Sequence, residues 1–569
     1  MSWLSYCYKT YQNSVSEIGK QQPGKVPLLP VAHTTQQVNI EVELDKDGNF
    51  QYAGLLAQDQ RTTIIPCTEE SSARTSGMVP HPLVDKLQYI AADYPTFGGS
   101  KESGWPLYHK QLQAWCTSPY AHPAVCTVLH YLEKECLIAD LVKANILFID
   151  ENGTLPTKWQ GNKEDKPPIL DTLTGSDQTE SFVRFRVDNV DLSRDTTVRE
   201  SFIRFYETQL KDIDYCTVQG IKMPVSTLSP YKIRNPGDRA KLISSNDNTN
   251  YTYRGRFADA AQALSIGYET TQKAHSALRW LVSKQGVNTG DQTVLVWGTQ
   301  NEAVPNVLGD TLDIAQEYNP LAGDDWDDFE EDTERLPADT QEEIARQFNR
   351  AILGYQHQLK DNSQTAVMIL DSATPGRLSI RYYQELQGSK LLANIKDWHD
   401  TFQWQLEYRS VEEPTELGKK PKIKKVVFVG APAPADIAKA AYGEKVDAKL
   451  KQATIERLIP CITNGERFPR DLMISAVDRA TNSIGLDYWE QQKTQNIACA
   501  LVRGYYHRNK KVDYPMNVDE TIKDRNYLFG RILACAEQIE RRALIQQGNE
   551  NEKRLTNAER LRTAFALHP

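Results

Sequence analysis

The sequence lacks the features of a membrane or secreted protein. No apolar run reaches the roughly 18 residues that span a bilayer, and the first residues, MSWLSYCYKT, have neither the cationic start nor the apolar core of a signal peptide. The nine cysteines form no CxxC pair, and their odd number and wide spacing exclude a zinc knuckle or a disulfide framework. Reduced thiols of this kind predict a cytoplasmic protein.

An excess of positive charge is also missing. The chain has 66 Lys and Arg against 75 Asp and Glu, a formal net charge of -9. A free-standing nucleic-acid binder is more often basic, so this balance argues against one. It leaves open a subunit that presents one basic face within a larger assembly.

Signatures of catalysis are scarce. The chain contains no HExxH, GxSxG or paired-carboxylate motif, and its ten histidines are scattered. One alternative function starts from the pair His399-Asp400, which could belong to a metal-dependent nuclease. Such an enzyme needs further His and Asp ligands at helical spacing, which the scattered histidines do not favour. We therefore expect a protein that is not an enzyme, with no cofactor and no metal site.

Two short motifs have partial matches to ligand loops. Gly19 to Lys25 has the spacing of a phosphate-binding loop up to its lysine, but Val26 stands where a Ser or Thr must ligate magnesium. Asp45, Asp47 and Gly48 resemble the start of a calcium loop without its later ligands. A hairpin turn explains the second motif better.

Hydrophobic periodicity predicts an α+β protein, with a mixed N-terminal α/β body that contains antiparallel hairpins and a C-terminal all-α helical bundle. Apolar and polar residues alternate on both sides of Asp45–Gly48, which predicts a hairpin over 37–57. Near the end, Leu528, Ile532, Cys535 and Ile539 follow a helical period and predict an apolar stripe. Other expected elements are a helix at 3–16, a mainly helical stretch at 81–149, and strands at 182–188, 293–297, 366–370, 378–383 and 426–429.

The sharpest change of composition lies at 323–334, where eight of twelve residues are acidic. Like charges at this density favour an exposed connector. We therefore divide the chain into an N-terminal α+β body at 1–300, an acidic linker at 301–340, a second mixed α/β region at 341–446 and a C-terminal helical bundle at 447–569.

The segment from Lys232 to Phe257 concentrates six cations against two acids around a stretch of amide and hydroxyl side chains. Cations bind phosphate, and amides and hydroxyls hydrogen-bond to polar edges, so we predict a nucleic-acid surface here. The loop at Arg74, Thr75 and Ser76 is a second candidate, because an arginine on a small polar finger fits a groove. The candidate DNA-binding residues are Arg74, Thr75, Ser76, Lys232, Arg234, Arg239, Lys241, Ser244, Ser245, Asn246, Asn248, Arg254 and Arg256. The five lysines of 419–425 are a weaker candidate for phosphate contact.

The order of motifs is also informative. YCTVQG at 215–220 and Pro224 precede the basic segment, an aromatic helix starts at Tyr268, and a strand follows at 291–297. ALVR at 500–503 and YLFGRILA at 527–534 come near the end. In this order the chain resembles the large subunit of the type I-C CRISPR Cascade complex, over almost its whole length.

The resemblance implies a role in antiviral defence. The family's large subunit sits at one end of an RNA-guided complex, recognises a short flanking motif (the PAM) in double-stranded DNA, stabilises the displaced strand and helps to recruit a helicase-nuclease, without cutting DNA itself. The implied partners are target double-stranded DNA, guide crRNA mainly through other subunits, the backbone, handle-binding and small subunits, and the helicase-nuclease; no membrane is involved. A third reading, besides the nuclease, is a purely structural scaffold.

The resemblance also concerns the C-terminal end. In this family the helical part is made a second time from an internal start, as the small subunit, and Met473 is the candidate start here. Family members usually continue with more helix beyond the point where this chain stops, at Pro569, so we expect a final bundle that is shorter or incomplete.

Overall fold

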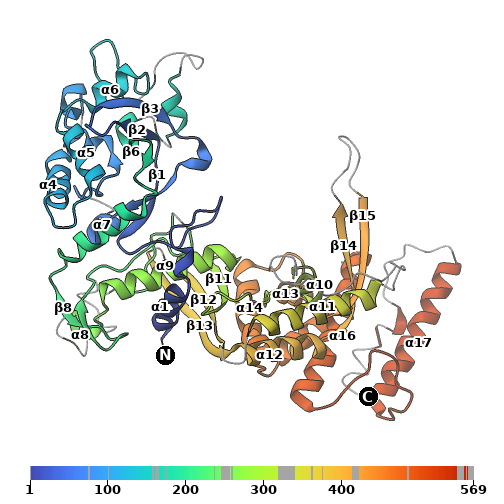
Figure 1. The fold of residues 1–569 in the computed structure, drawn as a ribbon. Helices are drawn as coiled ribbons and strands as arrows, with labels where there is room; N and C mark the ends of the chain where they lie inside the picture. The colour runs from blue at the N-terminus through green and yellow to red at the C-terminus, as the bar shows by residue number, and fades with distance from the viewer. Residues whose placement is uncertain are drawn as a thin grey trace, which may run out of the picture. The chain divides into compact units, whose positions relative to one another are not determined.

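In the computed structural model the chain forms two compact units (Figure 1). Unit 1 comprises 1–286 together with 371–380, and unit 2 comprises 287–370 together with 381–569. The structure describes residues 2–74, 77–99, 101–156, 159, 166–173, 175, 177–235, 237–244, 257, 260–317, 340–359, 363–374, 376–412, 422–482, 486–547, 556–558, 560 and 561.

Unit 1 is built around a mixed five-stranded sheet. Its strands lie in the order β3-β2-β6-β5, and β7 also pairs with β6. β2 and β3 form the predicted antiparallel hairpin, whereas β2 and β6 run parallel. The strands are β2 (Ile40–Leu44), β3 (Phe50–Leu55), β5 (Asp85–Lys86), β6 (Phe182–Val187) and β7 (Val190–Asp191).

The alternating pattern separates an apolar from a charged face of this sheet. Ile40, Val42 and Leu44 are wholly buried in the core of unit 1. On the other face, Glu41 of β2 accepts a hydrogen bond from Arg184 Nε at 2.7 Å and lies 3.8 Å from Arg186 Nη1. Arg184 and Arg186 therefore lie on one face of β6.

Helices supply the rest of the unit 1 core. Apolar residues of α4 to α7 pack against the sheet residues in one cluster. The long helix α9 lies against α1, where Trp3 contacts the buried His275 edge-on at 5.4 Å. The remaining elements are α1 (Trp3–Asn13), β1 (His33–Gln37), β4 (Thr62–Pro66), α2 (Glu69–Ser72), α3 (Leu87–Ile90), α4 (Trp105–Cys116), α5 (Pro123–Leu132), α6 (Leu137–Lys143), α7 (Thr196–Glu207), β8 (Ile213–Tyr215), β9 (Lys222–Pro224), α8 (Ala260–Ala263) and α9 (Tyr268–Gln285).

Unit 2 combines a four-stranded sheet, in the order β10-β11-β12-β13, with the antiparallel hairpin β14–β15 and a group of helices. Its core contains Trp398 and Phe402, whose rings stack at 4.1 Å. The elements before the last helices are β10 (Val287–Thr289), β11 (Gln292–Gly298), α10 (Thr311–Glu317), α11 (Thr340–Gln358), β12 (Gln364–Thr374), β13 (Arg377–Gln387), α12 (Gly388–Thr401), β14 (Trp404–Glu412), β15 (Lys422–Gly430) and α13 (Pro434–Tyr442).

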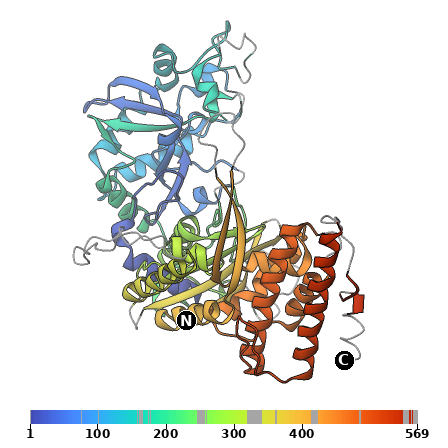
Figure 2. The same ribbon diagram turned by 90° about the vertical axis from the view of Figure 1, so that its right-hand side faces the viewer.

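From Asp447 onward the described residues contain helices and no strand, as predicted. α13, α15 and α16 contact one another, and Figure 2 shows the helices of this end side by side. Met473, the predicted internal start, is buried near the start of α15. A chain that began there would lack α13, α14 and the first three residues of α15. The helices are α14 (Ala448–Thr463), α15 (Arg470–Ala480), α16 (Tyr488–Tyr505) and α17 (Arg525–Gln546).

The apolar stripe near the end is helical, as expected, but it is exposed. It lies on α17, where the side chains of Ile532 and Ile539 are 61% and 69% exposed. An apolar stripe normally faces a packing partner. Within the described residues no element covers this one.

The predicted α+β class is confirmed by the mixed sheet of unit 1 and the helical end of unit 2. Within the predicted acidic linker, 318–339 lie outside the described residues, and the four-part division stays a prediction. In the described part of the chain, no helix is both long and apolar enough to cross a membrane.

Candidate nucleic-acid interface

A buried carboxylate fastens the chain that leads into the basic segment. Glu69, in the short helix α2, accepts hydrogen bonds from Leu228 N at 2.9 Å, from Thr227 N at 3.0 Å and from Thr227 Oγ1 at 3.1 Å. The hydroxyl of Ser226 donates to the same carboxylate. These bonds bring 226–228 against α2, which immediately precedes Arg74.

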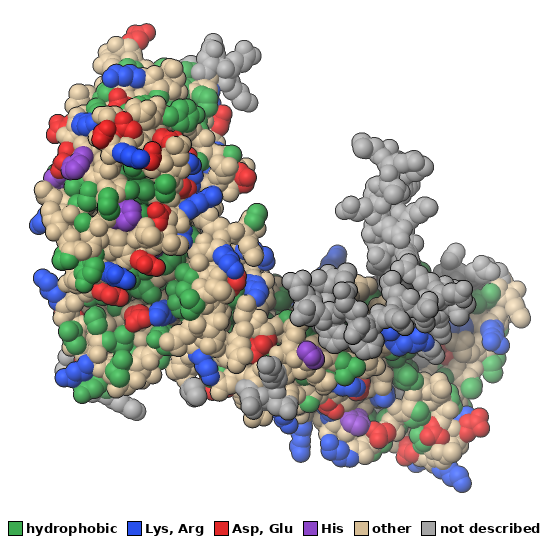
Figure 3. Space-filling model, in the orientation of Figure 1, with side chains coloured by type: hydrophobic (Ala, Val, Ile, Leu, Met, Phe, Trp, Pro, Cys, Tyr) green, Lys and Arg blue, Asp and Glu red, His purple; other side chains and the backbone are tan. Residues whose placement is uncertain are grey.

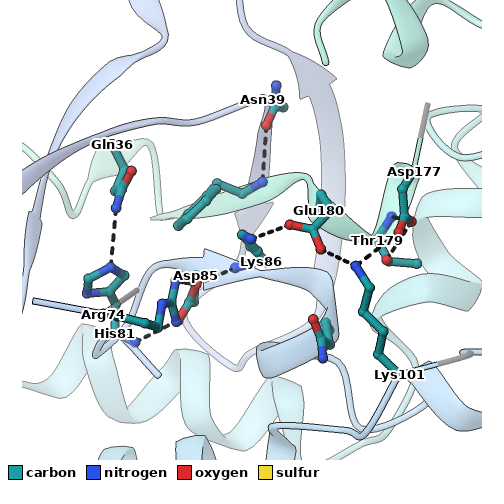
Figure 4. A network of polar contacts seen from close by, with 12 residues as sticks. Gln36, Asn39, Arg74, His81, Asp85, Lys86, Lys101, Asp177, Thr179 and Glu180 are labelled. Carbon is teal, nitrogen blue, oxygen red and sulfur yellow. Dashed lines mark hydrogen bonds and ion pairs between the residues drawn. The ribbon is translucent and has the colours of Figure 1, made fainter. Parts of the chain in front are cut away.

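Arg74 is engaged within unit 1. Its Nη1 and Nη2 atoms donate to Asp85 at 2.9 and 3.0 Å, and Nη1 also donates to the carbonyl of Val79 at 2.8 Å. Asp85 is wholly buried and accepts two further bonds, from the backbone amides of His81 and Lys86 (Figure 4). A bidentate pair of this kind is strong and directional. Arg74 therefore anchors this region, and its predicted contact with DNA stays a prediction.

His81 extends the same network as a neutral side chain. It is buried, and burial lowers its pKa to about 4. Its Nδ1 lies 2.9 Å from Ser71 Oγ. Its Nε2 lies 3.3 Å from Gln36 Nε2 (Figure 4). Nearby, Lys86 donates to Glu180. The network links α2, β1, β5 and the approach to β6.

The basic segment begins in a tight turn around Asp238. Lys232 has a left-handed backbone, with φ of 64°, a conformation that non-glycine residues adopt rarely. Its amide donates to the carbonyl of Asp238 at 2.8 Å, and Arg234 Nε donates to Asp238 Oδ2 at the same distance. Asp238 Oδ1 accepts from the amide of Ala240 at 3.0 Å. This carboxylate shapes the turn and neutralises Arg234.

A second segment joins the turn through its backbone. Leu378 N donates to Lys241 O at 3.0 Å, and Lys241 N donates to Gly376 O at 3.3 Å. Gly376 has φ of 85°, which glycine adopts without a steric penalty. The pairing places Arg377, which is exposed, directly beside Lys241.

Cations gather around Tyr231 with few acids among them. Burial lowers the pKa of Lys232, and the nearby Arg279, Arg239 and Arg74 lower it further. The same three arginines oppose the rise that burial causes in the pKa of Tyr231. Among the described residues, no carboxylate pairs with Lys232, Arg239 or Arg279. We call these three residues the cation cluster.

The structure describes six of the thirteen predicted DNA-binding residues. Arg74 and Arg234 are in internal ion pairs, Lys232 and Arg239 belong to the cation cluster, Lys241 adjoins Arg377, and Ser244 ends the described segment. The other seven lie outside the described residues: Thr75, Ser76, Ser245, Asn246, Asn248, Arg254 and Arg256. In the lysine run at 419–425, the backbone of 422–425 belongs to β15.

Sequence reasoning missed two cations of this interface. Arg279 lies within ALRWLV at 277–282, which looks like the buried side of a helix. The lone arginine in this apolar run could have indicated a binding site, because a buried charge needs a partner. Arg377 gave no local signal, since only the folded chain brings it beside Lys241.

The concentration of cations is local. On the face that Figure 3 shows, Lys and Arg are interspersed with Asp and Glu over the part that corresponds to unit 1. Such mixing fits the net charge of -9. A long-range field that attracts any polyanion is therefore not expected, and binding here must depend on specific contacts.

The rival pair His399-Asp400 does not form a ligand set. His399 is buried, its Nδ1 lies 2.8 Å from Thr311 Oγ1, and its ring centroid lies 4.9 Å from that of Phe348. Burial lowers the pKa of His399 to about 3. Asp400 is half-exposed and pairs with Lys396. His399 therefore serves as a neutral core residue.

Asp400 does line an open hollow of about 510 Å³ with Asp397, His507, Asp513 and Asp519. Partners already engage these acids: Asp397 accepts from Arg508 at 2.7 Å, and Asp513 pairs with His507. Across the described ranges, no group of three or more His, Cys, Asp or Glu side chains could hold a metal ion. The nuclease alternative gains no support from this hollow.

The two partial motifs also have structural explanations. Lys25 Nζ donates to Ser283 O at 2.9 Å and Val26 N donates to Ser283 Oγ at 2.8 Å, so this segment lies against α9 and is followed by no helix. Asp45 Oδ1 accepts from the amide of Asn49 at 2.8 Å in the turn between β2 and β3. Neither arrangement resembles the ligand loop that its spacing suggested.

Comparison with protein families defines the class of this protein. Residues 7–569 match the family described as CRISPR-associated protein (Cas_Csd1), and the chain belongs to that family. Csd1 is the large subunit of the type I-C Cascade complex, so the resemblance drawn from the sequence is confirmed. Comparison with curated proteins found no match.

Proposed function

We propose that the chain acts as the large subunit of an RNA-guided surveillance complex and recognises the PAM in double-stranded target DNA. The observation that carries this proposal is a set of cations that pair with no described carboxylate and that unit 1 gathers from three separate segments. Lys232, Arg239 and Lys241 come from the basic segment, Arg279 from α9 and Arg377 from the tip of β12–β13. These side chains suit the phosphates of a duplex.

The proposed roles divide between position and sequence. These cations contact phosphate and set the register of the duplex. Ser244 and the predicted residues that follow it read base edges of the PAM, because hydroxyls and amides distinguish base pairs where cations on phosphate do not. The buried pairs Arg74–Asp85 and Arg234–Asp238 hold the supporting turns.

An acidic protein suits this division of labour. Pairing with the guide crRNA, held mainly by other subunits, supplies most of the sequence specificity, so this chain needs only local cations. In our proposal it stabilises the displaced strand, contacts the backbone, handle-binding and small subunits, and helps to recruit the helicase-nuclease that cuts. The chain itself catalyses no step and works in the cytoplasm.

The test compares complexes assembled with and without the chain, on target duplexes that differ only in the flanking motif. We expect the complex to bind target duplex only when it contains this chain and the duplex carries one particular flanking motif. Binding that ignores the motif would favour a scaffold. Metal-dependent cleavage by the purified chain, lost in His399→Ala, would favour the nuclease.

A further inference from the structure

Arg279 is a buried cation that has no partner in the described part of the chain. Its side chain lies in the second half of α9 and is only 8% exposed. No described residue forms a hydrogen bond or ion pair with it, and its Nε atom is fully buried without an acceptor. Burial lowers its pKa to about 10, which still leaves it protonated at neutral pH. An uncompensated buried charge is costly to a fold.

The two described titratable groups that act on Arg279, Cys67 and Tyr231, are both neutral. Cys67 is the main group whose charge would offset that of Arg279, but burial raises its pKa to about 12, so the thiol is neutral. Burial likewise raises the pKa of Tyr231, which keeps its phenol neutral.

The buried carboxylates of the adjoining turns already have partners. Asp85 accepts from Arg74 and from two backbone amides, and Glu69 accepts from 226–228. Asp238 is engaged by Arg234 and by the amide of Ala240. The anion that would compensate Arg279 is therefore not among the described side chains.

We propose that Arg279 and Lys232 form a recessed seat for one phosphate of the nucleic-acid backbone. The guanidinium fork matches two phosphate oxygens, and the ammonium contributes a second charge from the turn. Lys232 is held there by its left-handed backbone and by the bond from its amide to Asp238 O. Arg239 is exposed and offers a separate contact at the surface.

This inference rests on the proposed function for the identity of the ligand, since a phosphodiester and an acidic side chain of another subunit both carry one negative charge. The nucleic acid is favoured because Lys232 begins the segment that continues into Ser244 and the other amide and hydroxyl side chains. A phosphate held in the seat would fix the position of the duplex relative to those side chains.

The test has two arms, each with Arg279→Gln, Arg279→Lys and a control, Arg204→Gln, which removes an exposed charge from α7. In the first arm, Tm of the full chain is measured in inorganic phosphate and in chloride at equal ionic strength. We expect phosphate to raise Tm of the wild type. Arg279→Gln should lose this response without a fall in Tm in chloride, since it removes an uncompensated charge.

In the second arm, binding of target duplex by the assembled complex is measured against salt. We expect Arg279→Gln to reduce the slope of log K against log salt by about 0.9, the value for one phosphate. Arg279→Lys should retain the slope with weaker binding, and Arg204→Gln should match the wild type.

The outcomes separate the two proposals. If the wild-type complex binds the duplex and Arg279→Gln has an unchanged slope, the seat is wrong. If the complex does not bind DNA, the proposed function fails, and the phosphate response alone decides whether the seat exists. If an acidic peptide displaces phosphate from the seat and the duplex does not, the ligand of the seat is not a nucleic acid.

Discussion

Two arginines in one turn should behave differently when the complex binds DNA. Arg234 donates to the buried Asp238 at 2.8 Å, whereas Arg239 is exposed and pairs with no described carboxylate. Replacing either one by Gln removes the same charge from the same turn. The two variants therefore serve as controls for each other.

The expected magnitude follows from counterion release. Each phosphate contact contributes about 0.9 to the slope of log K against log salt. Over a fourfold change in salt, one contact changes affinity by about 3.5-fold. Arg239→Gln should therefore bind less tightly than the wild type at low salt, and the difference should shrink by about 3.5-fold across that range.

Arg234→Gln should leave the slope unchanged. It removes a charge-assisted hydrogen bond and leaves a buried carboxylate unpaired, which should cost about 2 kcal/mol of stability. Binding of a fluorescent target duplex at a series of salt concentrations, with urea unfolding of each chain, measures both effects. Equal slopes for the two variants would refute the distinction between structural and phosphate-binding cations.

Three further outcomes are expected. Asp85→Asn should lower the free energy of unfolding by about 3 kcal/mol in urea, because it breaks a buried ion pair; Asp188→Asn, in an exposed pair with Lys46, should cost less than about 1 kcal/mol, and equal losses would contradict this assignment. Arg254→Ala with Arg256→Ala, predicted from the sequence alone, should weaken duplex binding broadly and reduce the salt slope by about 1.8; unchanged affinity at several salt concentrations would oppose it. Burial raises the pKa of Asp310 to about 7, so unfolding stability should fall by up to about 4 kcal/mol as pH rises from about 4 to about 7. Asp310→Asn should remove this pH dependence of the free energy of unfolding, measured by urea titration. If the variant and the wild type have the same pH profile, Asp310 is not its cause.

Local elements could be predicted from the sequence because their periods are short. The alternation at 40–44 identifies the strand β2, and Asp45 to Gly48 identifies its turn. The parallel pairing of β2 with β6 could not be predicted in this way, since it depends on contacts between distant segments. The stripe on α17 illustrates the same limit: its period predicts a helix, but burial depends on a partner that no local pattern specifies.

The candidate site could be predicted only in part, because some of its features are local in the sequence and others depend on the fold. The cations of the basic segment are visible as a local concentration of charge. The sequence does not show which of these cations lack an acidic partner. Only the folded turn brings Asp238 to Arg234 and leaves Arg239 without a described carboxylate. Arg279 also gains its meaning from burial beside Tyr231, which a sequence pattern does not record.

The central claim is that this chain reads a short motif beside the target in duplex DNA. The most direct measurement is selection by the assembled complex from target duplexes with a randomised flank. The wild type should enrich a restricted set of motifs, and alanine at Ser244, Ser245, Asn246 and Asn248 should broaden that set. Arg239→Gln should keep the same set at lower affinity. Binding without flank preference, or a preference unaltered by the four alanines, would contradict the claim.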